Sequence, residues 1–200
     1  MTMVTTFLLG VAYPLVVTGF AHALFHDNAN GQLVQRDGHI IGSAIIAQGF
    51  ASDRYFHPRA SAAGTGYDAA NSGGTNLGPT NKKLIDTVRA ATDAARKENP
   101  GAVVPVDLVT TSASGLDPHI SPENALFQVP RVAHARNISQ AELRVLVSQH
   151  TEGRQLGFLG EPRVNVLLLN LDLDEWSARK GLTHAERRGP GRDLYSSAKR

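Results

Sequence analysis

Residues 4–24 read VTTFLLGVAYPLVVTGFAHAL, and this stretch decides how the rest of the chain is placed. Between Met1 and Phe25 there is no Asp, Glu, Lys or Arg. A helix of roughly 20 apolar residues is long enough to cross the hydrocarbon core of a bilayer. The sequence therefore predicts one transmembrane helix within residues 1–25, spanning about 4–24.

Two other interpretations of this stretch stay open. Ala21-His22-Ala23 imitates the cleavage site of a signal peptide, although the basic residues that usually precede such a peptide are missing. A buried core helix is the third interpretation, which the length of the apolar run disfavours.

Three residues of the span suggest that another helix packs beside it. Pro14 frees a backbone carbonyl, and Gly10 and Gly19 offer a flat surface to a neighbouring helix. The alternative is that Gly and Pro are simply common in membrane helices.

The remaining chain has the composition of an ordinary globular protein. Its 200 residues carry a formal charge of +2 and no dense run of Lys and Arg, which argues against nucleic acid as a partner. Cysteine is absent, so disulfides and Cys-based zinc sites are excluded. We expect a single domain of mixed α/β (α+β) class at residues 26–176, followed by a polar, disordered tail at 177–200.

Local patterns predict the elements of this domain. Ser121 and Ser139 carry N-cap signals, and Ser139 to Glu142 forms a capping box. Pro130 is expected to end or kink the helix that follows Ser121, and could open a second short one. The polar residues 26–38 should be a connector, and the other expected elements are a strand at 39–46, a long loop at 54–81, a helix at 81–97, an edge strand at 103–109, helices at 121–136 and 139–150, and a buried central strand at 164–171.

The segment from Thr111 to His119 is the most tempting catalytic candidate. It holds Ser112, Ser114, Asp117 and His119, a set of groups from which a hydrolase could draw. The G-x-S-x-G nucleophile elbow is missing, however, and Ser-Gly and Asp-Pro are turn dipeptides. A rigid, shaped loop explains this segment better than a reaction centre.

The glycine-rich run at residues 72–81 invites a phosphate-binding interpretation. Its glycines could bring backbone N–H groups close to an anion, but the Gly-Lys-Ser/Thr ending and the G-x-G-x-x-G spacing are both absent. The alternatives are an ordered turn, with Asn81 capping the next helix, or a backbone surface for a protein partner. Metal binding is equally weakly supported, since none of the eight histidines lies in H-E-x-x-H.

Four arginines, Arg59, Arg131, Arg136 and Arg163, lie beside turn residues. A guanidinium there can brace a loop by bonding several carbonyls, or reach a carboxylate of a partner. Specified loops without a reaction centre are typical of recognition surfaces.

Six blocks of sequence, taken together and in order, resemble one known family. They are Tyr13-Pro14-Leu15; Gly42-Ser43 to Gln48 and Phe50; Tyr55-Phe56 with Arg59 and Ser61; Tyr67 with Ser72 to Pro79; Val104 to Asp107, Ser112 to Pro122 and Arg131-Val132-Ala133; and Gly160 to Leu167 with Leu169-Asn170. The chain resembles the KdpC subunit of the bacterial P-type potassium-transporting ATPase. Two departures are Ala47 and Asn137, where the family usually has Gly; Asn can adopt the left-handed conformation that a helix end requires.

The resemblance implies a topology and a set of partners. The helix would cross the bacterial inner (cell) membrane once, with the N-terminus cytoplasmic and the domain periplasmic or extracellular. The partners would be a potassium-channel-like subunit and a P-type ATPase subunit, together with membrane lipid. Potassium would be the transported ion.

It also implies a role without catalysis. The family is described as a catalytic chaperone that raises the affinity of the ATPase subunit for ATP, so ATP could be bound in a ternary complex with that subunit. No cofactor, metal or catalytic residue is expected in this chain, which lacks the P-type phosphorylation motif. Because an external domain would not meet cytoplasmic ATP, stabilising the complex or gating near the external potassium entrance is physically easier.

On this hypothesis specific residues carry the docking. Those expected to meet a partner or brace a loop are Arg59, Ser72, Gly73, Gly74, Asn76, Gly78, Ser112, Ser114, Asp117, His119, Arg131, Arg163 and Asn165, and those expected to pack in the membrane are Gly10, Pro14 and Gly19. Two other classes stay open: a membrane-anchored hydrolase using Ser112 or Ser114 with His119 or His150, and a free-standing binding module.

Overall fold

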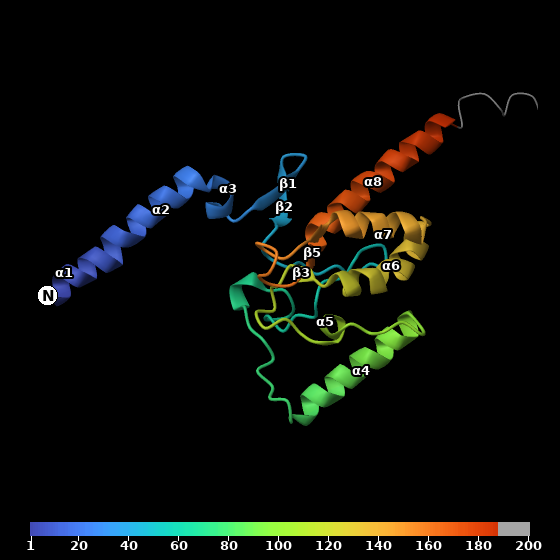
Figure 1. The fold of residues 1–200 in the computed structure, drawn as a ribbon, viewed down its shortest axis with the longest axis horizontal. Helices are drawn as coiled ribbons and strands as arrows, with labels where there is room; N and C mark the ends of the chain where they lie inside the picture. The colour runs from blue at the N-terminus through green and yellow to red at the C-terminus, as the bar shows by residue number, and fades with distance from the viewer. Residues whose placement is uncertain (188–200) are drawn as a thin grey trace, which may run out of the picture.

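An N-terminal helix stands away from a domain of helices and two small sheets in the computed structural model, which describes residues 1–187 (Figure 1). The helical stretch Thr2–Leu24 is long and apolar enough to cross a membrane, with a mean hydropathy of 1.8 and no part of it buried against the domain. The predicted helix and the mixed fold class are confirmed.

The membrane-type helix changes its winding just before Pro14. It comprises α1 (Thr2–Phe7), a π-helical turn (Leu8–Ala12) and α2 (Tyr13–Leu24). Proline has no N–H, and its ring crowds the carbonyl of the residue four positions earlier. In the turn before it the N–H of Tyr13 bonds the carbonyl of Leu8, five residues back, so the local widening accommodates Pro14 without ending the helix.

A β-hairpin follows a single turn of helix, α3 (His26–Ala29). Strand β1 (Leu33–Arg36) pairs antiparallel with β2 (His39–Ser43). Asp37 and Gly38, with φ of 51° and 78°, form the two-residue turn, and an Asp-Gly pair favours this turn type. The prediction of a plain connector at 26–38 was therefore wrong, and β2 ends three residues earlier than expected.

Residues 54–81 are irregular, as predicted, apart from one 3-10 turn at Ala69–Asn71. Helix α4 (Lys82–Glu98) then begins at Asn81, whose side chain accepts from the N–H of Lys83. Only Ala95 of α4 is buried, and Ile85 is 44% exposed. In Figure 1 the N-terminal end of α4 extends away from the domain.

The expected edge strand at 103–109 is wrong. Pro105 instead precedes a single helical turn, α5 (Val106–Val109), and the hydroxyl of Thr110 donates to the carbonyl of Val106. The turn presents Asp107 to the segment around Ser121, as described below.

Helix α6 (Pro122–Arg136) begins after strand β3 (His119–Ile120) and is capped by the Ser121 side chain. It continues through Pro130, so the first of the two expectations there, an end of the helix, is wrong. Asn137, at its C-terminal end, has φ 54° and ψ 47°, which confirms the expected left-handed residue.

Helix α7 (Gln140–Gln149) starts with the predicted capping box. The buried strand predicted at 164–171 is mostly a helix: β5 (Arg163–Asn165) is short, and α8 (Val166–Arg187) begins immediately after it. The side-chain oxygen of Asn165 accepts from the N–H of Leu168 and so caps α8.

Helix α8 also changes the expected boundary at residue 176. Residues 177–187 continue the helix rather than starting a disordered tail, and the rest of that predicted tail lies outside the described residues.

The core lies where α6, α7 and α8 meet a three-stranded antiparallel sheet of order β3-β5-β4, with β4 at Thr151–Glu152. Its fully buried members include Phe56, Ile120, Val129, Leu143, Leu169 and Leu173. This core fixes the ends of the long loops described next.

Candidate functional site

The two loops singled out by sequence meet in the folded domain. We call residues 72–79 the glycine loop and residues 111–119 the serine loop. The Ser72 hydroxyl and the N–H of Gly73 both donate to the carbonyl of Ser114, at 2.9 Å each. The serine loop is also bonded to residues 60–61, through Ser112 N–H to Ala60 and the Ser61 hydroxyl to Gly115.

Two glycines allow this close approach. A Cβ on Gly74 would lie 2.7 Å from the carbonyl oxygen of Ala113. A Cβ on Gly115, which has φ +69°, would lie 2.7 Å from Ala63 Cβ and 2.8 Å from the carbonyl oxygen of Gly73. These positions need Gly because backbones touch there, rather than to receive an anion.

Arg59 joins the far end of the serine loop to the preceding segment. Its guanidinium contacts Asp117 Oδ2 at 3.3 Å and donates to the carbonyl of Thr111 at 3.1 Å. Asp117 Oδ1 accepts from the N–H of His119, whose Nδ1 lies 3.6 Å away. Burial acts to raise the pKa of Asp117, but the contacts with His119 and Arg59 outweigh it and hold that pKa below its usual value.

The hydroxyls of this loop point to the loop itself. Ser112, only 2% exposed, lies 3.2 Å from the Ser114 hydroxyl, and Ser114 accepts from the N–H of Leu116. His150, the other histidine considered, pairs with Asp172 at 3.0 Å. Among residues 1–180, whose side chains the structure describes, no group of three His, Asp or Glu is placed to hold a metal ion.

A shallow groove of about 690 Å³ borders the serine loop. Its lining includes Arg59, Val106, Asp117, His119 and Arg163. Val106 is 74% exposed at this edge. The structure thus brings Arg163 to the same groove as Arg59 and His119, although Arg163 itself pairs with Glu152 at 2.9 Å rather than bracing a carbonyl.

Buried amides fasten the segment before the glycine loop, and sequence reasoning missed them. Gln128, 1% exposed, accepts from the N–H of His57 and donates to its carbonyl. Asn170, also 1% exposed, does the same for Phe56, at 2.8 and 2.9 Å. Each amide replaces a β-strand partner for an irregular backbone, which would otherwise bury unpaired polar groups.

A half-buried carboxylate extends this set of polar contacts. Asp107 accepts from the backbone and hydroxyl of Ser121 and from the side chain of Asn124. Asn124 in turn accepts from Gln128 at 2.8 Å. Burial and the nearby Arg131 lower the pKa of His57 at the other end of the chain of contacts. Polar residues spaced by four on an otherwise buried helix were the available sequence signal.

Two largely buried arginines also hold this segment. Arg131 donates to the carbonyls of Asp53 and Tyr55 and pairs with Glu98 at 2.8 Å. Arg136, whose side chain is 2% exposed, bonds the carbonyl of Arg54 and pairs with Asp174 at 2.7 Å. It also lies over the ring of Tyr55.

The remaining candidates are spread over different surfaces. Asn165 is buried and donates to the carbonyl of Ala44 at 2.7 Å, so it ties β5 to the end of the hairpin. Asn76 has φ 53° and is exposed, and a Cβ on Gly78 would meet open space. Gly10 and Gly19 are likewise open, with nothing within 4 Å of an added Cβ.

The chain is similar to known proteins over most of its length. Residues 1–175 match the family described as KdpC, the c chain of the K+-transporting ATPase. A potassium-transporting ATPase KdpC subunit of Koribacter versatilis is 63% identical over 174 residues, covering 87% of this chain and 90% of its own. Similar subunits of Rhodopseudomonas palustris (strain BisB18) and Rhodospirillum rubrum are 58% and 59% identical, covering 84% and 85% of this chain and 91% and 89% of their own.

Proposed function

Because the chain belongs to the KdpC family, and is therefore an accessory subunit of a potassium-transporting ATPase complex, we propose that it acts by docking rather than by chemistry of its own. The docking partners would be a potassium-channel-like subunit and the P-type ATPase subunit. The observation that carries this proposal is that the polar groups of the two loops form hydrogen bonds with each other and with the adjacent Ser61, which holds the loops in one shape.

The membrane helix supplies one docking surface. The surface of the helix is unobstructed at Gly10 and Gly19, and the π-helical turn before Pro14 widens the helix locally. Small residues allow close approach of helices in a bilayer, where van der Waals packing drives association. We propose that a helix of the channel-like subunit packs at Gly10 or at Gly19, which are nine positions apart and therefore face roughly opposite sides of the helix.

The glycine and serine loops supply the second surface. Buried bonds at Ser112, Gly115 and Arg59 hold their shape, while Thr75, Asn76 and Gly78 stay exposed at the rim. A pre-organised surface loses little conformational entropy when it binds. We propose that Ser72 to Pro79 and Ser112 to Ile120 contact a partner subunit.

The experiment that tests the loop surface compares two exposed threonines. Thr75→Lys places a charge on the glycine loop, and Thr87→Lys places the same charge on the exposed face of α4. Each tagged full-length variant is purified from gently solubilised membranes with its partners. Thr75→Lys should recover less of the other subunits than Thr87→Lys, and equal recovery would count against the loop surface.

Topology and the ATP-related role need their own test. We propose that the N-terminus is cytoplasmic and the domain lies outside the bacterial inner membrane, on the family resemblance. The chain has no cysteine, so a single Val145→Cys change can be labelled with a membrane-impermeant maleimide in intact cells or spheroplasts. Labelling from the outside supports this topology, and labelling only after lysis contradicts it.

An outside domain cannot touch cytoplasmic ATP, which favours stabilisation of the complex near the external potassium entrance. The family's described role, a chaperone that raises ATP affinity within a ternary complex, is the second candidate. Measuring the KM for ATP of the assembled pump with wild-type and Thr75→Lys subunits separates them. A changed KM at unchanged subunit recovery favours the chaperone role; loss of recovery without a change in KM favours stabilisation.

A further inference from the structure

The loop between β4 and β5 carries an apolar tip that the proposed function leaves unused. At residues 156–159 Leu156 is 83% exposed, Phe158 is 69% exposed and Leu159 is 47% exposed. Exposing three large apolar side chains together on a protruding turn is costly in water. We call residues 156–159 the apolar tip.

The apolar tip is held in one shape. Gln155 and Leu159 exchange both backbone hydrogen bonds, at 2.9 Å each, and close the turn. Leu156 has φ 53°, a left-handed conformation in which the Cβ of a residue other than glycine crowds the backbone. Glycine is the usual residue at a positive φ, and it occupies the next position, Gly157, which has φ 82°. The fold therefore accepts strain to present a leucine here.

Charged residues surround the base of the tip. Arg154 pairs with Glu161 at 2.7 Å, and further down the hairpin Arg163 pairs with Glu152 at 2.9 Å. Segments that enter the boundary between lipid head groups and acyl chains have this arrangement, in which apolar side chains lie beyond charged ones.

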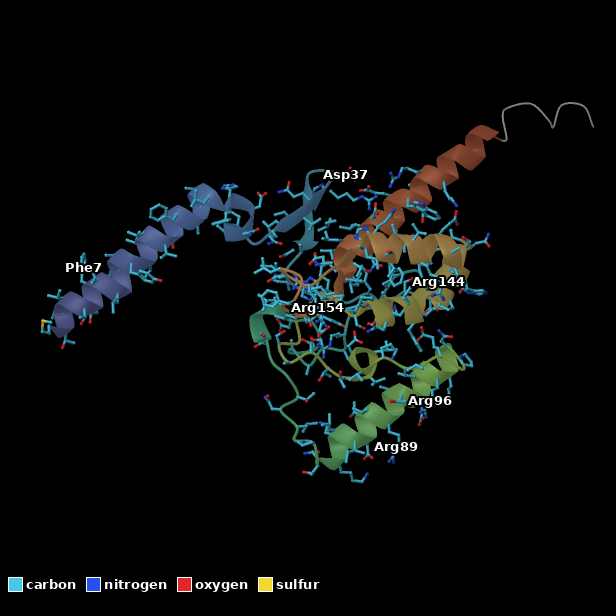
Figure 2. All side chains as sticks on the ribbon, in the orientation of Figure 1. Phe7, Asp37, Arg89, Arg96, Arg144 and Arg154 are labelled. Atoms are coloured by element: carbon cyan, nitrogen blue, oxygen red, sulfur yellow. The ribbon has the colours of Figure 1, made fainter. Side chains whose placement is uncertain are left out.

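The tip is connected to the part of the domain nearest the membrane helix. Eight residues separate Leu24 from Leu33, so β1 starts within about 30 Å of the helix end even if they were fully extended. Asn165, at the end of β5, is bonded to Ala44 just beyond β2. Figure 2 shows Arg154 on the side of the domain toward the N-terminal helix, and Arg144 of α7 on the opposite side.

We propose that the apolar tip is a second membrane anchor, which inserts Leu156, Phe158 and Leu159 into the interface of the leaflet at the C-terminal end of the span, near Leu24. The ligand is the lipid bilayer surface, because the tip is apolar above charged residues and the short connector after Leu24 keeps the domain close to the bilayer. With the helix as one attachment and the tip as another, the domain would be fixed in orientation rather than free to swing. This inference rests on the proposed membrane span.

The test uses a fluorescent probe on the otherwise cysteine-free full-length chain. Single variants Phe158→Cys, Val145→Cys and Phe20→Cys are labelled with an environment-sensitive NBD group. Val145, 57% exposed on α7, is the matched apolar control, and Phe20 in the span is the positive control. Each is reconstituted, alone and with the partner subunits, into phosphatidylethanolamine–phosphatidylglycerol vesicles with and without doxyl-labelled lipid.

The expected result is strong quenching by doxyl lipid at positions 158 and 20 and little at 145, with and without partners. A probe at 158 that is unquenched while 20 is quenched would overturn the tip and leave the span standing. If the probe at 158 is blue-shifted but unquenched in the assembled complex, the tip meets protein and the proposal is wrong. An unquenched probe at 20 would refute the span, and the tip with it. Leu159→Cys repeats the test should the Phe158 variant not fold.

Discussion

Gly115→Ala should separate the two loops at the site, because the added methyl meets three atoms at once. The Cβ would lie 2.7 Å from both the Cβ and the backbone nitrogen of Ala63 and 2.8 Å from the carbonyl oxygen of Gly73. Two of these three atoms belong to the backbone, so no side-chain rotation relieves the overlap. Either the loop moves or the contact is lost.

The magnitude has two parts. Holding Ala at the φ of +69° costs about 1 kcal/mol relative to Gly. Overpacking adds about 1–3 kcal/mol. The free energy of unfolding should therefore fall by about 2–4 kcal/mol in total.

Gly101→Ala is the matched control. Gly101 has a similar φ of +83°, but an added Cβ there meets nothing within 4 Å, so only the conformational part of about 1 kcal/mol applies. Urea unfolding of the full-length chain in detergent, followed by the fluorescence of its single tryptophan, Trp176, measures both. Equal losses of stability in the two variants would refute the close approach of the loops.

Three further predictions follow from other contacts. Asn170→Leu should lower the free energy of unfolding by about 2–6 kcal/mol, since it leaves the N–H and carbonyl of Phe56 buried and unpaired, whereas Thr75→Leu on the exposed rim should change it by less than about 1 kcal/mol in the same urea assay. The pKa of Asp117 is lowered in the folded state, so its contribution to stability is present above the ordinary pKa of 3.8 and is lost as the pH falls through the folded pKa. A pH titration of unfolding should show the wild-type advantage over Asp117→Asn shrinking in that acid range, and a constant advantage would contradict it. Arg136→Lys should be destabilising despite the kept charge, because Lys cannot at once pair with Asp174, bond the Arg54 carbonyl and stack on Tyr55, and a thermal melt equal to that of the wild type would show that the bracing is unimportant.

Local signals predicted the parts of the fold that depend on local chemistry. The N-caps at Asn81, Ser121 and Ser139 were all readable, since each acts within three residues of its own position. The apolar helix was equally clear from its length.

The misassigned strand at 164–171 shows why apolar runs are ambiguous. Burial on several sides removes the polar alternation by which a strand and a helix differ. The helical signal began at the end of the run and continued beyond it, where Asn170, Asp174 and Ser177 follow at intervals of four and three and share one face of α8. The missed hairpin is simpler, because Asp37-Gly38 is a strong turn signal that the polarity of the segment concealed.

The sequence singled out the loop residues and arginines of the candidate site but not their contacts, and it missed the buried amides Gln128 and Asn170. Arg59 and Asp117 are 58 positions apart, and Gln128 is 71 positions from the backbone of His57. Such pairs are set by the packing of the whole domain, which no local pattern encodes. Whether the exposed residues at the loop rim meet a partner subunit stays a prediction.

Affinity purification of the tagged full-length chain, with and without Met1 to Phe25, followed by ATPase assay with and without potassium, tests the central claim most directly. The account predicts that the full-length chain recovers the channel-like and ATPase subunits with potassium-stimulated hydrolysis, and that the chain lacking its helix loses both. A full-length chain recovered alone from cells that express the pump would contradict it.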